Sequence, residues 1–451
     1  MRLCSQLADC FTDFRDQDFV EHDLDVLLRQ RILGLALGYE DINDHERLRL
    51  DPLMAAMCGR ADLLGLERTM AQDKGKPLAG KSTLNRLELG AQETNLRTKK
   101  IQAHPEKIEA LLLERGVAAI PRKSDIIILD FDATDDPIHG RQEGAFYHGC
   151  YRDYCYLPLY CFCGDIPLWA QLRTADRDGA DGSLEALKKI VAAIRKRFGK
   201  HVRIIVRSDS GFCRDEFMSW IEAEPNVHYI LGLARNARLE KMLVPAFWQT
   251  AQKLDADLAA CAQAAGADEA PIVEEGTERT FAELRYQTRK SWSCERRVIG
   301  KAEMTNGKKN PRFIVTDIEL GADWIAEHAA LADGQALYEK LYCGRGDMEN
   351  RIKEQQLDMF ADRTSTAYLS SNQLRLWFST FAYLLMSQLR AVALAGTRLA
   401  KATVGTIRLH LMKVAAQVTV SVRRVYVRLS SACPQQEIFA QAHAKLRAAS
   451  S

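Results

Sequence analysis

The chain has 451 residues, of which 47% are hydrophobic and 27% are charged, and its net charge is +2. This composition excludes a disordered or fibrous protein, and the length suits about two or three globular domains. Twelve cysteines are scattered through apolar segments with no signal peptide before them, so we expect free thiols in a cytoplasmic protein. No apolar run approaches the ~20 residues that cross a bilayer, so we expect no membrane insertion.

Residues 1–105 are predicted to form a separate helical domain. Apolar residues recur there at helical spacing, most clearly in 26–37 and 46–66, and β-branched alternation is rare. A turn followed by a short polar helix near 80–92 suits a helix-turn-helix that binds DNA. The DNA contacts expected from it are Lys81, Asn85 and Arg86.

A competing motif overlaps this turn. Residues 75–82 fit the pattern G-x-x-x-x-G-K-[ST] of a nucleotide-binding P-loop, which works only when a buried strand delivers the loop to a helix. Residues 66–74 are polar and helical in pattern, so no strand is expected there. We therefore predict a basic turn, with Ser82 or Thr83 capping the following helix.

From residue 124 the pattern changes to β-strands. Four runs bounded by Gly, Pro and Asp predict an antiparallel meander, at 125–132, 145–151, 157–162 and 168–173. Alternating helices and strands follow, at 182–198, 202–209, 214–224 and 228–233. A meander followed by β-α-β units predicts an α/β protein with a mixed sheet and flanking helices, whose first part covers 106–239.

A β-rich stretch then interrupts the core and is predicted to be an insertion, 240–325. Its strands are expected at 279–287, 294–304 and 312–318, and residues 281–312 hold nine Lys or Arg against three Glu. Such a basic patch suits DNA. The candidate contacts are Arg289, Lys290, Arg296 and Arg297, with Trp292 either stacking on an unpaired base or lying in the core.

Helical periodicity resumes in the second part of the core, 326–400. The last segment, 401–451, is basic, and within it residues 409–429 mix strand and helix signals, so their secondary structure stays open. Residues 390–430 hold eight Lys or Arg and no acid, which suits DNA binding by this basic C-terminal segment. Arg423 and Arg424 are its candidate contacts.

Three acids occupy positions typical of a metal-dependent phosphoryl-transfer site. Asp132 and Asp209 each close an apolar run and precede turn residues, so both carboxylates are expected at strand ends beside a crevice. Asp130 lies two residues before Asp132 on the same side of the strand, and either aspartate fits the pattern. Glu349 is expected to arrive from a helix, and the three carboxylates would hold Mg²⁺ or Mn²⁺ as hard oxygen ligands.

The helix around Glu349 carries a polar stripe. Tyr342, Arg345, Glu349 and Lys353 are separated by three, four and four residues, so they share one helical face. A phenol, a guanidinium, a carboxylate and an ammonium on one face suit metal ions and a phosphodiester better than a protein core.

These motifs resemble the DDE transposases of bacterial insertion sequences, in particular the subgroup called transposase DDE domain group 1. The resemblance rests on 129–140, 207–212 and the Tyr342, Arg345, Glu349 signature, and it extends to 82–88 and to 411–414 with Arg423 and Arg424.

The resemblance implies an RNase H-like core in which Asp132, Asp209 and Glu349 form the catalytic triad and Tyr342 and Arg345 support it. In related transposases a lysine follows seven residues after the glutamate, where this chain has Gln356, while Lys353 stands four residues after it. The resemblance further implies two Mg²⁺ or Mn²⁺ ions per site, and double-stranded DNA of terminal inverted repeats and target as partner. It implies a homodimer on paired ends in the bacterial cytoplasm, associated with the nucleoid when bound to DNA.

Two other classes of protein stay open from the sequence. One is a transposase-derived DNA-binding protein that has lost catalysis, which the intact acids disfavour. The other is a P-loop ATPase acting on DNA, which depends on the motif at 75–82. A nuclease of the same fold that does not join its products to target DNA is a closer neighbour.

Overall fold

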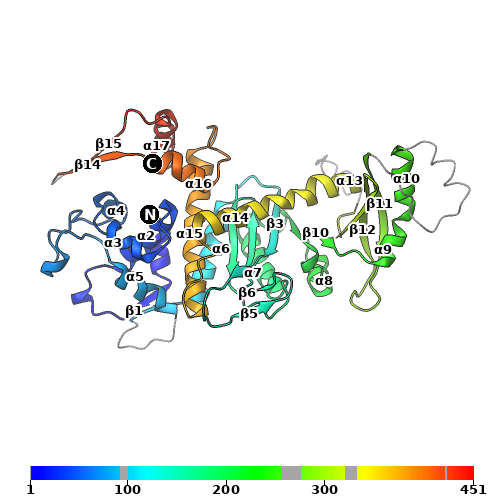
Figure 1. The fold of residues 1–451 in the computed structure, drawn as a ribbon, viewed down its shortest axis with the longest axis horizontal. Coiled ribbons are helices and arrows are strands. Elements are labelled where there is room, and N and C mark those ends of the chain that lie inside the picture. The colour runs from blue at the N-terminus through cyan, green and yellow to red at the C-terminus, as the bar shows by residue number, and fades with distance from the viewer. Residues whose placement is uncertain (1, 92–99, 255–275, 320–332, 422–423, 451) are drawn as a thin grey trace, which may run out of the picture.

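The central element of the fold is a mixed sheet. The computed structural model describes residues 2–91, 100–254, 276–319, 333–421 and 424–450 (Figure 1). Its eight-stranded sheet has the order β11-β12-β13-β10-β9-β3-β7-β8. The five strands that start the core are β3 Ile126–Ala133, β7 Leu159–Cys163, β8 Ile166–Gln171, β9 Arg203–Ser208 and β10 Val227–Leu233.

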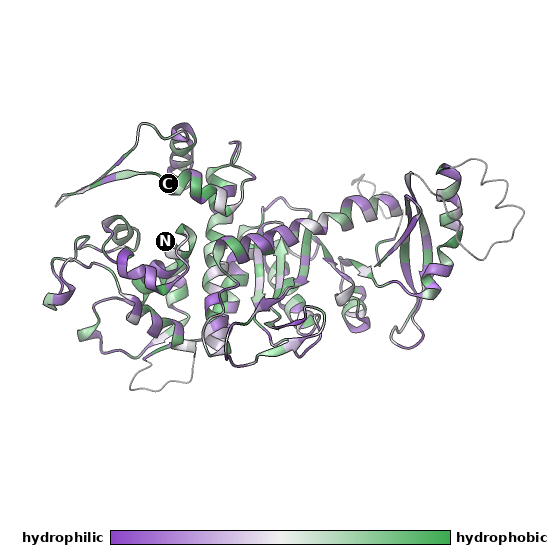
Figure 2. Ribbon diagram, in the orientation of Figure 1, coloured by the Kyte–Doolittle hydropathy of each residue, from purple (hydrophilic) through white to green (hydrophobic). Residues whose placement is uncertain are grey.

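The pairing of these five strands confirms the predicted α/β fold with a mixed sheet. β3 pairs antiparallel with β7, which pairs antiparallel with β8, while β9 runs parallel to both β3 and β10. The parallel strands are joined through α7 Ser183–Phe198 and α8 Asp215–Ala223. Strands at the middle of the sheet are largely apolar, and the outer strand β11 is more hydrophilic (Figure 2).

One strand of the predicted meander lies outside this sheet. β5 Phe146–His148 pairs with β6 Asp153–Tyr156, which pairs with β4 Asp136–Pro137, and the three form a small separate sheet. The prediction that 145–151 belongs to the meander is therefore wrong. Its apolar residues Phe146 and Tyr147 are exposed to solvent, so an apolar run did not mean a core strand here.

The strands expected in an insertion continue the central sheet. Helices α9 Ala237–Met242 and α10 Val244–Leu254 precede β11 Thr277–Tyr286, β12 Arg296–Thr305 and β13 Lys308–Thr316. β13 pairs antiparallel with β10, with Leu231 opposite Val315. The three strands thus extend the core sheet to one end of the elongated molecule (Figure 1).

A long helix joins the sheet to the rest of the chain. After the π-helical turn Leu337–Tyr342 and the 3-10 turn Cys343–Arg345 come α14 Gly346–Met359 and α15 Leu369–Ala393. In one hydrophobic core, Phe378 and Phe381 of α15 join Phe162 of the sheet and Leu28 of the N-terminal helices. Among the described helices, none is long and apolar enough to cross a membrane.

The N-terminal region is mostly helical, but its helices are short. They are α1 Arg2–Ala8, α2 Leu24–Leu37, α3 His45–Leu48, α4 Pro52–Met57, α5 Lys81–Glu88 and α6 Pro105–Ala119, with the paired strands β1 Phe11–Asp13 and β2 Ile101–Ala103. The predicted long helix at 46–66 is wrong. Asp51 caps a new helix that begins at Pro52, and a proline with a capping acid before it favours a helix start.

The C-terminal segment, unassigned from the sequence, contains both helices and strands. α16 Val404–Ile407 is followed by the hairpin β14 Ala416–Val420 and β15 Val425–Leu429, and then by α17 Gln436–Ser450. Every residue of β15 is exposed. Figure 1 shows this hairpin projecting from the end of the molecule that holds both termini.

Candidate active site

Two of the predicted acids lie side by side at strand ends. The parallel register of β3 and β9 places Asp130 opposite Arg207, so Asp132 and Asp209 follow two residues later on neighbouring strands. The Asp132 carboxylate accepts a hydrogen bond from the Ala133 amide at 3.0 Å, and Asp209 accepts one from the Gly211 amide at 2.8 Å. The bond to Gly211 caps a 3-10 turn, which fixes the position of Asp209.

Asp130 is held in a buried ion pair. Its two carboxylate oxygens accept hydrogen bonds from Nε and Nη2 of Arg207 at 2.6 and 2.7 Å. The remaining Arg207 nitrogen, Nη1, donates to the Leu341 carbonyl at 2.7 Å. Of the two aspartates left open by the sequence, Asp132 is therefore the one whose carboxylate is available to a ligand.

Arg345 connects the strand ends to the helix that carries Glu349. Its Nη2 donates to Glu349 Oε1 at 2.8 Å, and its Nη1 lies 3.6 Å from Asp132 Oδ2. Glu349 is in the first turn of α14, and its side chain is 49% exposed. The structure thus brings Arg345 and Glu349 close to Asp132, which precedes both of them by more than 200 residues in the sequence.

Burial dominates the electrostatics of this group. The pKa of Asp132 is raised to about 7, mainly by burial and also by the negative charges of Asp209 and Glu349, while the Arg345 charge lowers it. Burial also raises the pKa of the Tyr342 phenol, on which both Arg345 and Asp209 act. A carboxyl whose pKa is raised this far by burial is a candidate for a functional site.

The donor set suits a hard divalent cation. Asp132, Asp209 and Glu349 offer only carboxylate oxygens, the ligands that Mg²⁺ and Mn²⁺ prefer. As placed, no three Asp, Glu, His or Cys side chains in the described part of the chain are close enough to hold a metal ion. Here the Arg345 guanidinium is paired with Glu349 and lies beside Asp132, where it balances the charge that a metal ion would balance.

The helix that carries Glu349 is anchored by a second acid. Glu354 is buried on the opposite side of α14. Its carboxylate accepts hydrogen bonds from four donors, Arg351 Nη1 at 2.8 Å, Tyr383 Oη at 3.1 Å, Arg390 Nη1 at 3.0 Å and the Val404 amide at 2.5 Å. These contacts fix α14 to α15 and to the start of α16.

Comparison with known proteins matches the sequence of the chain to one family. The family model described as "Transposase DDE domain group 1" matches residues 1–451, the whole chain. The chain belongs to this transposase family. Among solved structures, it is similar to the cryo-EM structure of the piggyBac transposase synaptic complex with hairpin DNA. The two share 11% sequence identity at a TM-score of 0.38, over 90% of this chain and 78% of that one. No curated protein matches it.

Lys353 and Gln356 of this transposase have different surroundings. Lys353 is exposed on α14, and within the described residues it makes no hydrogen bond or ion pair. Gln356 Nε2 donates to the Asp135 carbonyl at 3.2 Å. Gln356 therefore ties α14 to the loop after β3, while the Lys353 ammonium remains available to a phosphate.

Residues 75–82 of the transposase, which match the P-loop pattern, do not have the strand–loop–helix structure of a P-loop. No strand precedes them, and residues 66–74 contain a single 3-10 turn at Ala71–Asp73 instead of the predicted helix. α5 begins at Lys81 with Gly80 as its N-cap, so the prediction that Ser82 or Thr83 caps it is wrong. The Lys81 amide donates to Glu46 Oε1 at 2.8 Å. A carboxylate already occupies the place where a nucleotide phosphate would bind.

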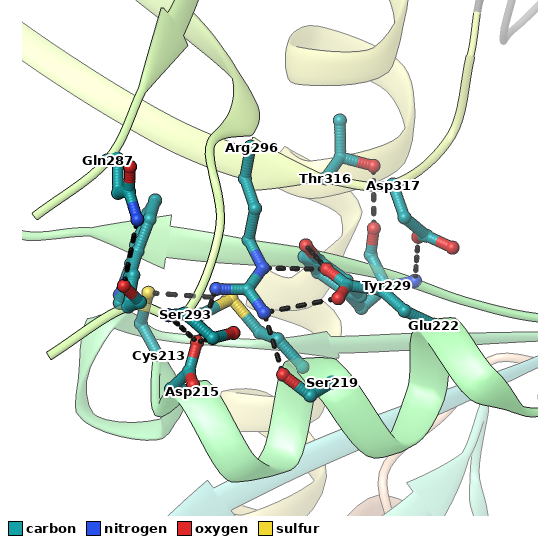
Figure 3. A network of polar contacts seen from close by, with 12 residues as sticks. Cys213, Asp215, Ser219, Glu222, Tyr229, Gln287, Ser293, Arg296, Thr316 and Asp317 are labelled. Carbon is teal, nitrogen blue, oxygen red and sulfur yellow. Dashed lines mark hydrogen bonds and ion pairs between the residues drawn. The ribbon is translucent and has the colours of Figure 1, made fainter.

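Three predicted DNA contacts of the transposase are buried, and two of them, Arg296 and Arg297, are in ion pairs within the protein. Arg296 donates to Asp215 Oδ1 and to Glu222 Oε1, both at 2.6 Å (Figure 3). Arg297 is paired with Glu283 at 2.8 Å, and Trp292 is 6% exposed beneath Arg296. The core alternative therefore holds for Trp292, and as placed the two arginines are not free to bind DNA.

The other predicted contacts are accessible where the structure describes them. Asn85 and Arg86 are exposed on α5, Arg289 and Lys290 are exposed between β11 and β12, and Arg424 is exposed before β15. Arg423 lies outside the described residues. Sequence reasoning missed Arg207 as a positioning residue, although a signal existed, because Arg207 stands two residues before Asp209 as Asp130 stands two before Asp132.

Proposed function

We propose that this transposase cleaves DNA at the terminal inverted repeats of an insertion sequence and transfers the freed 3′ ends into target DNA. The observation that carries the proposal is that Arg345 pairs with Glu349 and lies 3.6 Å from Asp132, while Asp209 follows the strand that neighbours the strand of Asp132. In this proposal two Mg²⁺ or Mn²⁺ ions are held by these three carboxylates. Once bound, such ions stabilise the charge that develops on the phosphate and make the attacking hydroxyl or water more nucleophilic.

The residues of the chain divide the remaining work. Asp132 must be deprotonated before it can hold a cation, because a neutral carboxyl is a poor ligand. Arg345 orients Glu349 and is placed to contact a phosphate oxygen. The buried pair of Asp130 and Arg207 fixes the Leu341 carbonyl, and so holds the turn that delivers Arg345.

The same proposal includes how DNA is held. Residues 1–105 would act as the DNA-binding domain through α5, where Asn85 and Arg86 are exposed. The loop with Arg289 and Lys290 and the basic segment 401–451 would contact further phosphates. Two ends must be held together for transfer, so a homodimer on paired ends in the bacterial cytoplasm is part of the proposal.

The test is cleavage of labelled DNA taken from the genomic borders of the protein's own gene. The wild type is compared with Asp209→Asn and Glu349→Gln in Mg²⁺, in Mn²⁺ and in EDTA. Asp347→Asn is the matched control, because Asp347 is an exposed acid in the same helical turn but points elsewhere, two residues from Glu349. We expect metal-dependent nicking at the element boundary that Asp347→Asn retains and both active-site variants lose. Binding without cleavage under every metal would refute catalysis and leave a DNA-binding remnant.

A further inference from the structure

Four aromatic side chains are exposed within nine residues of the small sheet. Phe146, Tyr147, Tyr151 and Tyr154 have exposed fractions of 41%, 57%, 41% and 55%, and together they form what we call the aromatic face. Tyr147 and Tyr154 meet edge to face, with ring centroids 5.6 Å apart. Large rings kept in water at this density mark a binding surface, because each would otherwise be stabilised by burial.

The aromatic face is near Asp132 and Asp209. β4 begins four residues after Asp132, and it pairs with β6 through Asp136 and Tyr156, so the small sheet is tied to the strand that ends in Asp132. After burial, the charges that act most on the Tyr151 phenol and raise its pKa to about 12 are those of Asp135 and Asp132. A strand that lies across these rings would therefore continue toward the candidate metal site.

Two arginines at the aromatic face could contact phosphates. Arg141 and Arg152 flank the aromatic face, and both are exposed. Within the described residues neither side chain is in an ion pair. The exposed acids of the same segment, Glu143 and Asp153, accept hydrogen bonds from the Leu369 amide at 3.1 Å and the Tyr154 amide at 2.7 Å.

We propose that the aromatic face binds unpaired nucleotides of the DNA substrate, with bases stacked on Tyr147, Tyr151 and Tyr154 and phosphates beside Arg141 and Arg152. Paired bases hide their faces in the duplex, so exposed rings can stack only on bases that have left it. The inference rests on the proposed function insofar as the unpaired strand is the one brought to the acids. In this inference the aromatic face stacks on unpaired bases, which was one of the two roles considered for Trp292, a residue that is buried in the structure.

The test is equilibrium binding of two DNA probes to the full chain in EDTA. One probe is a blunt duplex of roughly 20 base pairs, and the other is the same duplex with a tail of about ten thymidines. Fluorescence anisotropy measures both affinities for the wild type, Tyr147→Ala, Tyr151→Ala and Tyr151→Phe. Val392→Ala, which removes an exposed apolar side chain of α15, is the control.

We expect the wild type to prefer the tailed probe, and each alanine variant to lose about tenfold in affinity for it, as one lost stack costs. Tyr151→Phe and Val392→Ala should bind as the wild type does, and affinity for the blunt duplex should not change. Equal affinity of the wild type for both probes would overturn the inference, as would alanine variants that keep the preference. A change of oligomeric state in the alanine variants without a loss of tail binding would also overturn it, since the face would then be a protein interface.

The outcome is independent of catalysis. Binding is measured without metal, so the preference for the tailed probe does not depend on cleavage. Failure of the proposed function appears as absent cleavage with intact tail binding. Failure of this inference appears as absent tail preference with intact cleavage.

Discussion

Asp130 and Asp132 are two residues apart on one strand, and their neighbours on β9 give them different roles. Arg207 is opposite Asp130 and pairs with both of its oxygens. The residue that follows β9 near Asp132 is another acid, Asp209, and the cation that acts on Asp132, Arg345, comes from a different element. The sequence identifies both aspartates as candidates, but it does not show that Arg207 on the neighbouring strand pairs with Asp130 and not with Asp132.

This difference predicts opposite effects on stability. Asp130→Asn leaves Arg207 buried without its counter-charge, so we expect the free energy of unfolding to fall by about 3–5 kcal/mol. Asp132→Asn removes a carboxylate that burial disfavours, so stability at pH 8 in EDTA should be unchanged or higher while cleavage is lost. Urea denaturation of both variants measures the contrast. Equal destabilisation of both would contradict the assignment.

The raised pKa of Asp132 predicts a pH dependence of the metal-free protein. The pKa is about 7 in the folded state and 3.8 as the ordinary value, so the unfolded state releases this proton first. The contribution of Asp132 to stability is therefore present below pH 4 and is lost as the pH rises to about 7, by at most ~1.4 kcal/mol per pH unit. The measurement is the difference in unfolding free energy between wild type and Asp132→Asn across this range. A constant difference would refute the shift.

At the scale of elements, local patterns predicted helices well where nothing interrupted them. The predicted helices 182–198 and 214–224 correspond to α7 Ser183–Phe198 and α8 Asp215–Ala223. The predicted helix 46–66 is wrong because Asp51 and Pro52 start a new helix inside it. The basic stretch of β12 was misread for a similar reason, since the acids that pair with Arg296 are in α8, more than 70 residues earlier.

α14 positions Glu349 only if its buried side stays fixed. Glu354→Gln removes the charge that Arg351 and Arg390 share, so we expect a loss of about 3–5 kcal/mol in stability and reduced cleavage. Asn350→Ala, at an exposed position of the same helix, is the control and should change neither. Thermal unfolding and cleavage rates on the border DNA check both effects. Wild-type stability of Glu354→Gln would contradict the anchoring role.

The N-terminal helices contain two buried histidines that predict sensitivity to acid. Burial is the main cause that lowers the pKa values of His22 and His45 to about 3, and nearby arginine charges add to it. Both rings are neutral in the folded state, so their contribution to stability is complete above pH 6.5. It is lost as the pH falls toward 3, by about 1.4 kcal/mol per pH unit for each ring.

Replacement of one ring isolates this effect. His45→Gln should weaken the fall in stability between pH 7 and pH 5, even if it lowers stability at pH 7. Hydrogen exchange of α2 and α5 in full-length protein at both pH values is the measurement. An unchanged pH dependence in His45→Gln would show that this ring is not responsible.

At the scale of the whole molecule, one sheet connects regions that the sequence separates. The pairing of β10 with β13 joins strands that are more than 80 residues apart. Local patterning carries no information about such pairing, because the register depends on partners brought together only in the folded chain. The pairing of β7 with β8 and of β9 with β10 was predictable because these strands are neighbours in sequence within the sheet.

Continuity of the sheet predicts a pattern of hydrogen exchange. Amides of β12 and β13 should be protected as strongly as those of β9 and β10, because all four are interior strands of one sheet. Amides of the β14–β15 hairpin should exchange much faster, because two strands alone are marginally stable. Early exchange of β12 and β13 together, with β9 and β10 still protected, would contradict one cooperative sheet.

The anchoring of Glu354 by the Val404 amide has a consequence for protein synthesis. A ribosome releases Asp132 and Asp209 long before it makes Val404, and until then α14 lacks the last donor that fixes its buried side. A nascent or prematurely terminated chain would therefore contain Asp132 and Asp209, but the helix that carries Glu349 would lack one of the contacts that fix it. Under the proposed function, a cell that translates a damaged copy of the gene would make a fragment that cannot cut its chromosome.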